Sequence, residues 1–293
     1  MGREHTKRRL PGKWKPYLFL LPILLFAAGF VYYPFIRTFL YSFSLVNYSG
    51  EITGFVGMEN YRNLFANEVF HTALRNSLLL TVTIVPLMLV GSLSLALLSA
   101  EKRWLSPLYE TMFTLPMAMS MTSACMVFKL LLNPTLGIIN YALGVNFGWF
   151  KDTSTALVGI IIICVWIGLP FDFLLLLSAV RNMPAQLIES AKLDGAGYLR
   201  RLVSIVIPVI SPTIMYLICV NFVASIMTAA PVMLITEGGP ARSTTTLIYM
   251  MFTSGYQSSN YSTAACISVV TFLITFGVMA LSMYFERKRV YYE

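Results

Sequence analysis

Six long runs of apolar residues, separated by short polar stretches, dominate the pattern of the chain. They cover about residues 17–41, 76–100, 108–132, 155–180, 204–228 and 263–285. A helix of ~20 apolar residues crosses the ~30 Å hydrocarbon core of a bilayer. Backbone groups in lipid must be hydrogen-bonded within their own segment, so runs of this length predict helices, whereas a barrel would show short alternating segments. The pattern predicts an all-α, polytopic membrane protein with six transmembrane helices.

Composition supports this class, because 57% of the 293 residues are hydrophobic and only 12% are charged. A soluble domain of this size needs far more charge on its surface. We expect one transmembrane domain at 17–285, with a basic tail at 1–16 and a second tail at 286–293. The first run is too long for a signal peptide and has no small-x-small cleavage site after it, so we interpret it as a retained anchor.

The basic residues predict the orientation. Lys and Arg gather in the first tail, in the loops after the second and fourth runs, and in the last tail, which are the positions Lys102, Arg103, Arg181, Lys192, Arg200, Arg201 and Arg287 among others. By the positive-inside rule, both termini and these two loops are cytoplasmic. The net charge of +8 then reflects topology and contact with anionic membrane lipid. No nucleic acid is expected as a partner, because the basic residues do not share one folded face.

The polar stretch at 186–208, between the fourth and fifth runs, is the most unusual part of the sequence. It holds two carboxylates, several small residues, a glycine and a proline, which are Glu189, Ser190, Ala191, Asp194, Gly195, Ala196 and Pro208. Asp194 can cap a helix or pair with a basic residue, Gly195 lets the backbone reverse, and Pro208 is expected to bend the chain. The plainer alternative is a solvated turn with a capping aspartate.

This stretch resembles the EAA loop of the permease subunits of binding-protein-dependent ABC importers. Gly195 follows Glu189 by six positions, Ile205 follows ten later, and Pro208 three after that. Ser190 stands where the family usually has alanine. Three further segments, 55–65, 133–140 and 234–240, resemble outer-loop segments of sugar-importer permeases, so the likeness runs over most of the chain.

The resemblance implies the type I ABC importer permease fold in a bacterial cytoplasmic membrane. It implies transport of a di- or oligosaccharide, or a related polyol, by alternating access. The implied partners are a second permease subunit in a heterodimer, two copies of a cytoplasmic ATPase and an extracellular solute-binding protein. ATP and Mg would be bound by the ATPase, and no cofactor is expected on this chain, whose sequence has no P-loop. In the family the loop helix docks into a groove of the ATPase, which Glu189 and Ala191 would contact.

Polar residues in the fifth run are candidates for the substrate path. Asn221, Ser225 and Thr228 are spaced i, i+4 and i+7, so they are expected on one helical face. Such a row suits a hydroxyl-rich solute, and in the related maltose permease sugar contacts fall on this helix. The alternative is hydrogen bonding between helices.

The fourth run adds Gly168, Phe171 and Asp172 to the candidate path. An aspartate inside a membrane is expected to face the interior, where it is paired or hydrated. Asp172 could contact substrate, lock a gate, or pair with a neighbouring subunit. Phe171 could stack on a sugar ring or serve in packing.

Two other classes of membrane protein fit the sequence less well. An ion-coupled secondary transporter of a small polar solute would carry ion-site residues, for which Asp172 alone is thin support. An integral membrane enzyme would need clustered catalytic residues, and none is visible, so no catalysis is expected. The four cysteines lie inside apolar runs without paired spacing, and His5 and His71 are isolated, so neither a disulfide nor a metal site is indicated. Only coupling to an ATPase explains the loop at 186–208.

Overall fold

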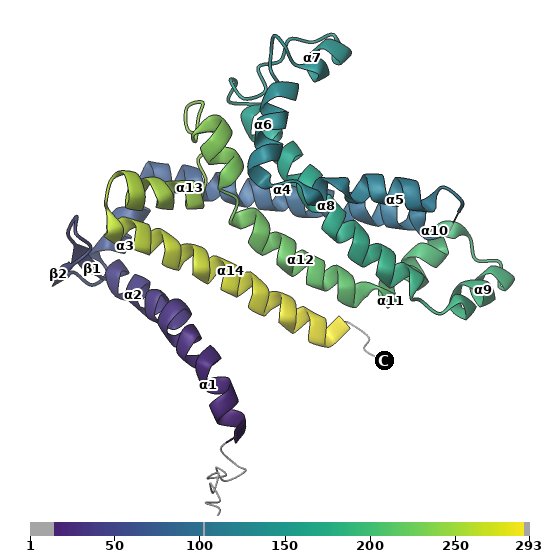
Figure 1. Ribbon diagram of the computed structural model, residues 1–293, viewed down its shortest axis with the longest axis horizontal. Helices are drawn as coiled ribbons and strands as arrows, with labels where there is room; N and C mark the ends of the chain where they lie inside the picture. The colour runs from purple at the N-terminus through teal and green to yellow at the C-terminus, as the bar shows by residue number, and fades with distance from the viewer. Residues whose placement is uncertain (1–14, 102, 290–293) are drawn as a thin grey trace, which may run out of the picture.

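The computed structural model describes residues 15–101 and 103–289, and these are mostly helical (Figure 1). The α-helices are α1 Lys15–Ala27, α2 Tyr33–Ser42, α3 Glu59–Phe65, α4 Glu68–Ser99, α5 Ser106–Thr114, α6 Met121–Leu131, α7 Ile138–Leu143, α8 Ala156–Arg181, α9 Ala185–Leu193, α10 Tyr198–Arg201, α11 Ile207–Val209, α12 Ser211–Ile226, α13 Leu247–Phe252 and α14 Tyr261–Arg289. Four π-helical turns, η1 Ala28–Tyr32, η3 Leu202–Val206, η4 Val232–Thr236 and η5 Thr253–Gln257, and one 3₁₀ turn, η2 Leu115–Ala118, connect some of them.

The all-α, multi-pass prediction is confirmed. Within the described chain, four helical segments are long and apolar enough to cross a membrane, at 17–42, 68–99, 156–181 and 261–284. Two bent pairs raise the number to six if each pair is one span. The last helix continues to Arg289, beyond the predicted end of the span at 285. Of the predicted tails, residues 1–14 and 290–293 lie outside the described residues.

Two spans predicted as single helices are broken. The segment predicted at 108–132 bends by 103° between η2 and α6. Pro116 lies in the 3₁₀ turn, and the side chain of Ser120 accepts a hydrogen bond from the backbone N–H of Ser123, which starts a new helix. The segment predicted at 204–228 bends by 71° between Val209 and Ser211. Proline residues on both sides of this break remove the hydrogen bonds that would keep the helix straight.

Helices α4 and α8 form the centre of the bundle and run in the same direction (Figure 1). A Cβ atom on Gly168 of α8 would lie 2.5 Å from Cε of Met88 on α4, and one on Gly91 would lie 3.1 Å from Cδ1 of Leu169. Small residues at these positions therefore let the two helices approach closely, as is typical of packing inside membranes. Helix α12 packs on both, and α14 packs on α2, α12 and α13.

Buried side chains follow this bundle from one end to the other. At one end Phe70, Leu247 and Ile267 pack under the strands; in the middle Leu80, Ile84 and Val232 meet α8; at the other end Phe173, Leu176 and Leu217 join α8 to α12. The end first named carries the antiparallel pair β1 Ser44–Val46 and β2 Ile52–Phe55. The other end carries α9 (Figure 1).

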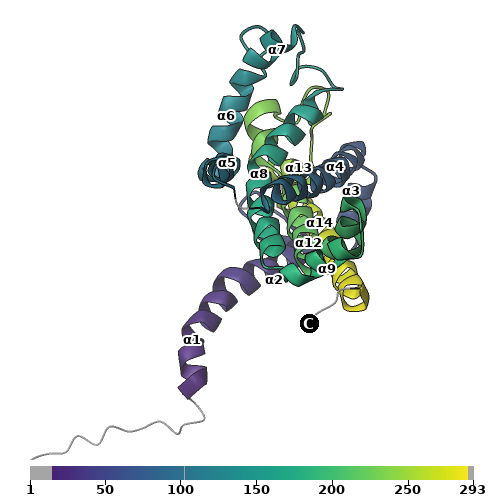
Figure 2. The same ribbon diagram turned by 90° about the vertical axis from the view of Figure 1, so that its right-hand side faces the viewer.

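Helix α1 leaves the bundle, as both views show (Figures 1 and 2). The most apolar stretch of the span at 17–42 has no buried residue, and Phe19 is 82% exposed. The segment formed by α6 and α7 also extends away from the other helices in both views, and Tyr141 on it is 90% exposed.

Candidate coupling loop and substrate path

The predicted cytoplasmic loop folds into the short helix α9, held at one end of the bundle (Figure 1). Pro184 precedes its first turn with an extended backbone, which ends the connection from α8. On the inner side of the helix, Ile188 packs against the cluster that contains Phe173 and Leu176. The loop is thus a helix seated on one end of the bundle.

Gly195 ends α9 in a Schellman motif. The backbone N–H of Ala196 donates to the carbonyl of Ala191 at 2.9 Å, and that of Gly195 donates to the carbonyl of Lys192 at 3.1 Å. Gly195 has φ +75°, a left-handed conformation that glycine adopts without steric cost. Because both bonds join backbone atoms, the turn that ends α9 depends on Gly195 and not on a side-chain cap.

The residues predicted to couple are divided between two faces of α9. Glu189, Ser190 and Asp194 are exposed, while Ala191 is only 8% exposed and faces its own subunit. The Ser190 hydroxyl donates to the carbonyl of Gln186 at 2.8 Å. Asp194 occupies the C-cap, not an N-cap, and among the described residues it forms no ion pair. The contact predicted for Glu189 is sterically open, whereas Ala191 serves in packing.

Exposed apolar side chains on this loop were not singled out from the sequence. Leu193 is 90% exposed, Leu199 73%, Tyr198 60% and Leu187 41%. The sequence does contain a signal for them. Apolar residues in an otherwise polar stretch, outside the predicted spans, have neither lipid nor a core to enter. A patch of this kind, rimmed by charged residues, is typical of a protein–protein contact.

A hollow of about 250 Å³ separates α9 from the next helical segment. Its lining consists of Ala191, Asp194, Ala196, Arg200, Arg201, Ser204 and Ile205. The predicted Ala196 and Asp194 therefore lie at its rim. The bend expected near Pro208 is found at Ile210, two residues further on, so the exposed Pro208 lies on the α9 side of the bend.

Asp172 and Asn221 form a buried pair between α8 and α12. The Asn221 Nδ2 atom donates to Oδ2 of Asp172 at 2.5 Å, and Asp172 is fully buried. The other carboxylate oxygen, Oδ1, has no hydrogen-bond partner among the described residues. The interior position predicted for Asp172 is confirmed. In this conformation the pair joins two helices of one subunit.

The predicted row of polar groups on the fifth span is incomplete. Ser225 is buried at 3% exposure, on the same side as Asn221. Thr228 lies beyond the end of α12 at Ile226, so the three residues do not share one helical face. The helix stops because the backbone bends at Met227, before the π-helical turn at Val232–Thr236.

The remaining path candidates contact neighbouring helices. Gly168 lies against Met88 as described above, and Phe171 is half-buried beside the cluster of Phe173 and Leu176. In this structure the contacts of these residues are hydrogen bonds and packing between helices, which are the alternatives to a role in the substrate path. Their role in a substrate path stays a prediction.

Known proteins resemble this chain over nearly all of its length. It is similar to the sn-glycerol-3-phosphate transport system permease protein UgpA of Pectobacterium atrosepticum, with 33% identity over 284 residues and 96% of each chain covered. It is also 32% identical to the Bacillus subtilis protein named "Probable ABC transporter permease protein YurN", covering 92% of this chain and 95% of that one.

The fold has a solved counterpart. A subunit in the crystal structure of a bacterial ABC transporter involved in the import of the acidic polysaccharide alginate superposes with a TM-score of 0.83, at 21% identity, over 94% of this chain and 96% of that one. The family described as "binding-protein-dependent transport system inner membrane component" matches residues 93–291. The chain therefore belongs to this family, as a multi-pass ABC importer permease of the inner membrane.

Proposed function

We propose that this permease moves a carbohydrate, or a related polyol, inward by ATP-driven alternating access. The observation that carries the proposal is α9, a short helix closed by its own backbone that presents Leu193 and Glu189 away from the bundle. A helix so exposed, and attached to the inner ends of α8 and α12, is suited to receive force from another protein.

The proposed assembly contains a second permease subunit in a heterodimer, two copies of a cytoplasmic ATPase and an extracellular solute-binding protein. The ATPase binds ATP and Mg, and this chain binds no cofactor. Both chain termini and α9 lie on the cytoplasmic side, as the distribution of Lys and Arg predicts. A bacterial alginate ABC transporter of similar fold has been solved in complex with an alginate pentasaccharide-bound periplasmic protein, which supports the external partner.

The proposed solute class follows from the relatives and from the chain's own polar residues. One group of relatives is named for sn-glycerol-3-phosphate, and the solved transporter for a polysaccharide. Both solutes carry hydroxyl groups. In the outward-open state, separation of α8 from α12 would free Asp172 and Asn221 from each other, and these groups can then hydrogen-bond hydroxyls.

The mechanism needs no covalent step on this chain. ATP binding closes the two ATPases, α9 moves with the ATPase that holds it, and the attached helices open the path outward. Solute enters from the binding protein, and hydrolysis resets the helices. The chain supplies the path and the lever, so changes in α9 should affect assembly with the ATPase without affecting the fold.

The test uses two exposed leucines, one at the end of α9 and one between α6 and α7. Leu193 is 90% exposed and Leu136 is 78% exposed, so a Leu→Glu change at either leaves the core intact. With the complete importer expressed and purified in detergent, Leu193→Glu is expected to lose the ATPase and its ATP hydrolysis, while Leu136→Glu retains both. Retention of the ATPase by Leu193→Glu would overturn the assigned docking face.

Uptake into proteoliposomes tests the solute class. Wild-type importer with its binding protein is expected to accumulate radiolabelled maltose or glycerol 3-phosphate only when ATP is enclosed. Accumulation of either solute under an ion gradient without ATP would instead support the ion-coupled alternative. Import of neither solute would overturn the proposed class.

A further inference from the structure

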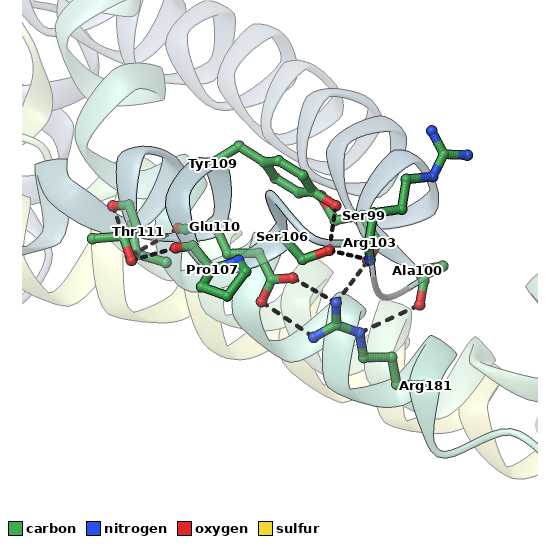
Figure 3. Close-up of polar contacts among 10 residues, drawn as sticks. Ser99, Ala100, Arg103, Ser106, Pro107, Tyr109, Glu110, Thr111 and Arg181 are labelled. Atoms are coloured by element: carbon green, nitrogen blue, oxygen red, sulfur yellow. Dashed lines mark hydrogen bonds and ion pairs between the residues drawn. The ribbon is translucent and has the colours of Figure 1, made fainter.

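Arg181, the last residue of α8, contacts the C-terminal end of α4 and the middle of α5 (Figure 3). Its Nη2 atom lies 2.5 Å from Oε1 of Glu110 on α5, and its Nη1 atom lies 3.2 Å from Oε2 of the same carboxylate. The Nη2 atom also donates to the carbonyl of Ser99 at 2.7 Å, and Nε donates to that of Ala100 at 3.4 Å. We call this group the Arg181 clasp.

The clasp supplies hydrogen-bond donors to the carbonyl groups at the C-terminal end of α4. The last carbonyls of a helix have no partner within it, and they carry the negative end of the helix dipole. A guanidinium group presents five donors in a fixed fork, so it can satisfy these carbonyls and a carboxylate together. Glu110 neutralises the charge of Arg181, and each side chain is 23% exposed. Partial burial and bidentate geometry make this pair stronger than an ordinary surface ion pair.

The turn between α4 and α5 is also fixed. The backbone N–H of Arg103 donates to the hydroxyl of Ser106 at 2.6 Å, and this hydroxyl lies 2.8 Å from that of Tyr109 (Figure 3). Tyr109 neighbours Glu110 in sequence, so the turn and the clasp hold the same stretch of α5. Arg181 thus joins the ends of α4 and α8 to α5.

The clasp lies directly before the coupling helix. Only residues 182–184 separate Arg181 from the first residue of α9. Met183 in this connection and Ile188 in α9 pack into the same cluster as Leu176 and Leu177 near the end of α8. A displacement of α9 therefore reaches Arg181 through a short, packed connection, with no long flexible segment between them.

We propose that Arg181 is a positioning residue for transport. It makes the end of α4, the helix α5 and the end of α8 move as one body when the ATPase displaces α9. This role rests on the proposed function, because it requires a force on α9. Without the clasp, α9 and α8 would still follow the ATPase, while α4 and α5 would lag, so ATP would be hydrolysed with less solute moved.

The chain offers a matched control. Glu101 and Arg103 form a second ion pair of 3.2 Å in the same α4–α5 turn, with side chains 78% and 72% exposed. An exposed pair of this kind contributes little. Glu101→Gln removes the same chemical group as Glu110→Gln, on the same side of the molecule, without touching the clasp.

The test measures uptake and hydrolysis together in proteoliposomes that hold the complete importer, with whichever of radiolabelled maltose and glycerol 3-phosphate the wild type imports. For Arg181→Gln and Glu110→Gln, solute moved per ATP hydrolysed is expected to fall about tenfold, within the range of typical coupling between sites. Arg181→Lys keeps the positive charge but loses the forked guanidinium group, so its solute-to-ATP ratio is expected to fall less. Glu101→Gln should match the wild type.

A distance measurement gives a readout independent of solute. Spin labels at Ala185→Cys on α9 and Thr111→Cys on α5, both exposed positions, are expected to keep one narrow distance with and without ATP. In the Arg181→Gln background the distance should change when ATP binds. The double variant Arg181→Gln, Glu110→Gln should resemble Arg181→Gln, because Glu110 has no other partner in the clasp once the guanidinium group is removed.

The outcomes separate the two proposals. If wild type neither retains an ATPase nor transports, the proposed function fails, whatever the variants do. If wild type transports but the clasp variants lose uptake and hydrolysis in equal proportion, or keep the wild-type ratio, the positioning role is overturned. If Arg181→Gln does not assemble with its partners, the amount of solute moved per ATP hydrolysed is compared instead for Glu110→Gln and Arg181→Lys, which test the same role.

Discussion

Two turns with left-handed glycines lie at opposite ends of the molecule and are held in different ways. The coupling turn, residues 194–197, is closed by backbone bonds around Gly195 at φ +75°. The anchored turn, residues 237–246, contains Gly238 at φ +79° and is fixed by side chains. Asn76 of α4 donates to the carbonyls of Arg242 and Thr245 at 3.1 and 3.0 Å, and Tyr249 donates to that of Glu237 at 2.8 Å.

The surroundings of the two glycines show the same contrast. A Cβ atom on Gly238 would lie 2.6 Å from Cε1 of Tyr249 and 2.7 Å from Oγ1 of Thr245, whereas one on Gly195 would meet nothing within 4 Å. In the anchored turn Gly238 and residues 244–246 are buried, although Ala241 and Arg242 are exposed. The coupling turn has a defined shape but open surroundings. A surface that another protein docks against needs both properties.

The largest effect is expected for Gly238→Ala. A left-handed alanine costs ~1–2 kcal/mol, and overpacking against Tyr249 and Thr245 adds ~1–3 kcal/mol, so the free energy of unfolding should fall by the sum of these terms. Thermal unfolding of the purified protein in detergent measures it. A midpoint equal to that of Gly195→Ala would show that the anchored turn is no more tightly packed than the coupling turn.

Asn76→Ala is expected to have the next largest effect. It leaves two carbonyls, those of Arg242 and Thr245, without their donor at a position where Asn76 is 2% exposed. Loss of a buried partner of this kind lowers the free energy of unfolding by ~1–3 kcal/mol. The control is Asn63→Ala on α3, which is exposed and should leave the unfolding midpoint unchanged.

The smallest effect on stability is expected for Gly195→Ala, at ~1–2 kcal/mol, from the left-handed backbone alone. Gly197→Ala is a close control, because its Cβ also enters open space and its φ is −64°. Retention of the ATPase during purification of the complete importer should fall for Gly195→Ala only. Equal behaviour of the two alanine variants would show that the Schellman motif does not set the docking geometry.

The sequence predicted what depends on local chemistry. Long apolar runs can only be spanning helices in lipid, and Gly195 was assigned a reversal because few residues can make one. The interior position of Asp172 followed from the cost of exposing a carboxylate to lipid. The residues that carry these predictions are near one another in the chain.

Contacts between segments that are far apart in the chain could not be predicted from the sequence. Asn221 bonds Asp172 across 49 positions, and Arg181 bonds Glu110 across 71. In the sequence, Arg181 contributes only to the predicted orientation, because no nearby residue indicates that Glu110 is its partner. The bends of 103° and 71° also depend on tertiary packing, because a proline marks where a helix weakens but does not fix the angle. Thr228 is predicted on the same helix because the apolar run extends to it, but α12 ends at Ile226.

The closure of α9 by backbone bonds has a consequence for how such a loop can change. Because Gly195 and two main-chain hydrogen bonds define its shape, the outward side chains carry little of the folding information. Leu187, Leu193 and Tyr198 can be exchanged for the residues of another importer while the helix persists. Partner choice and foldability are thus separate traits here, and this permease could be redirected to a foreign ATPase by replacing a few outward side chains.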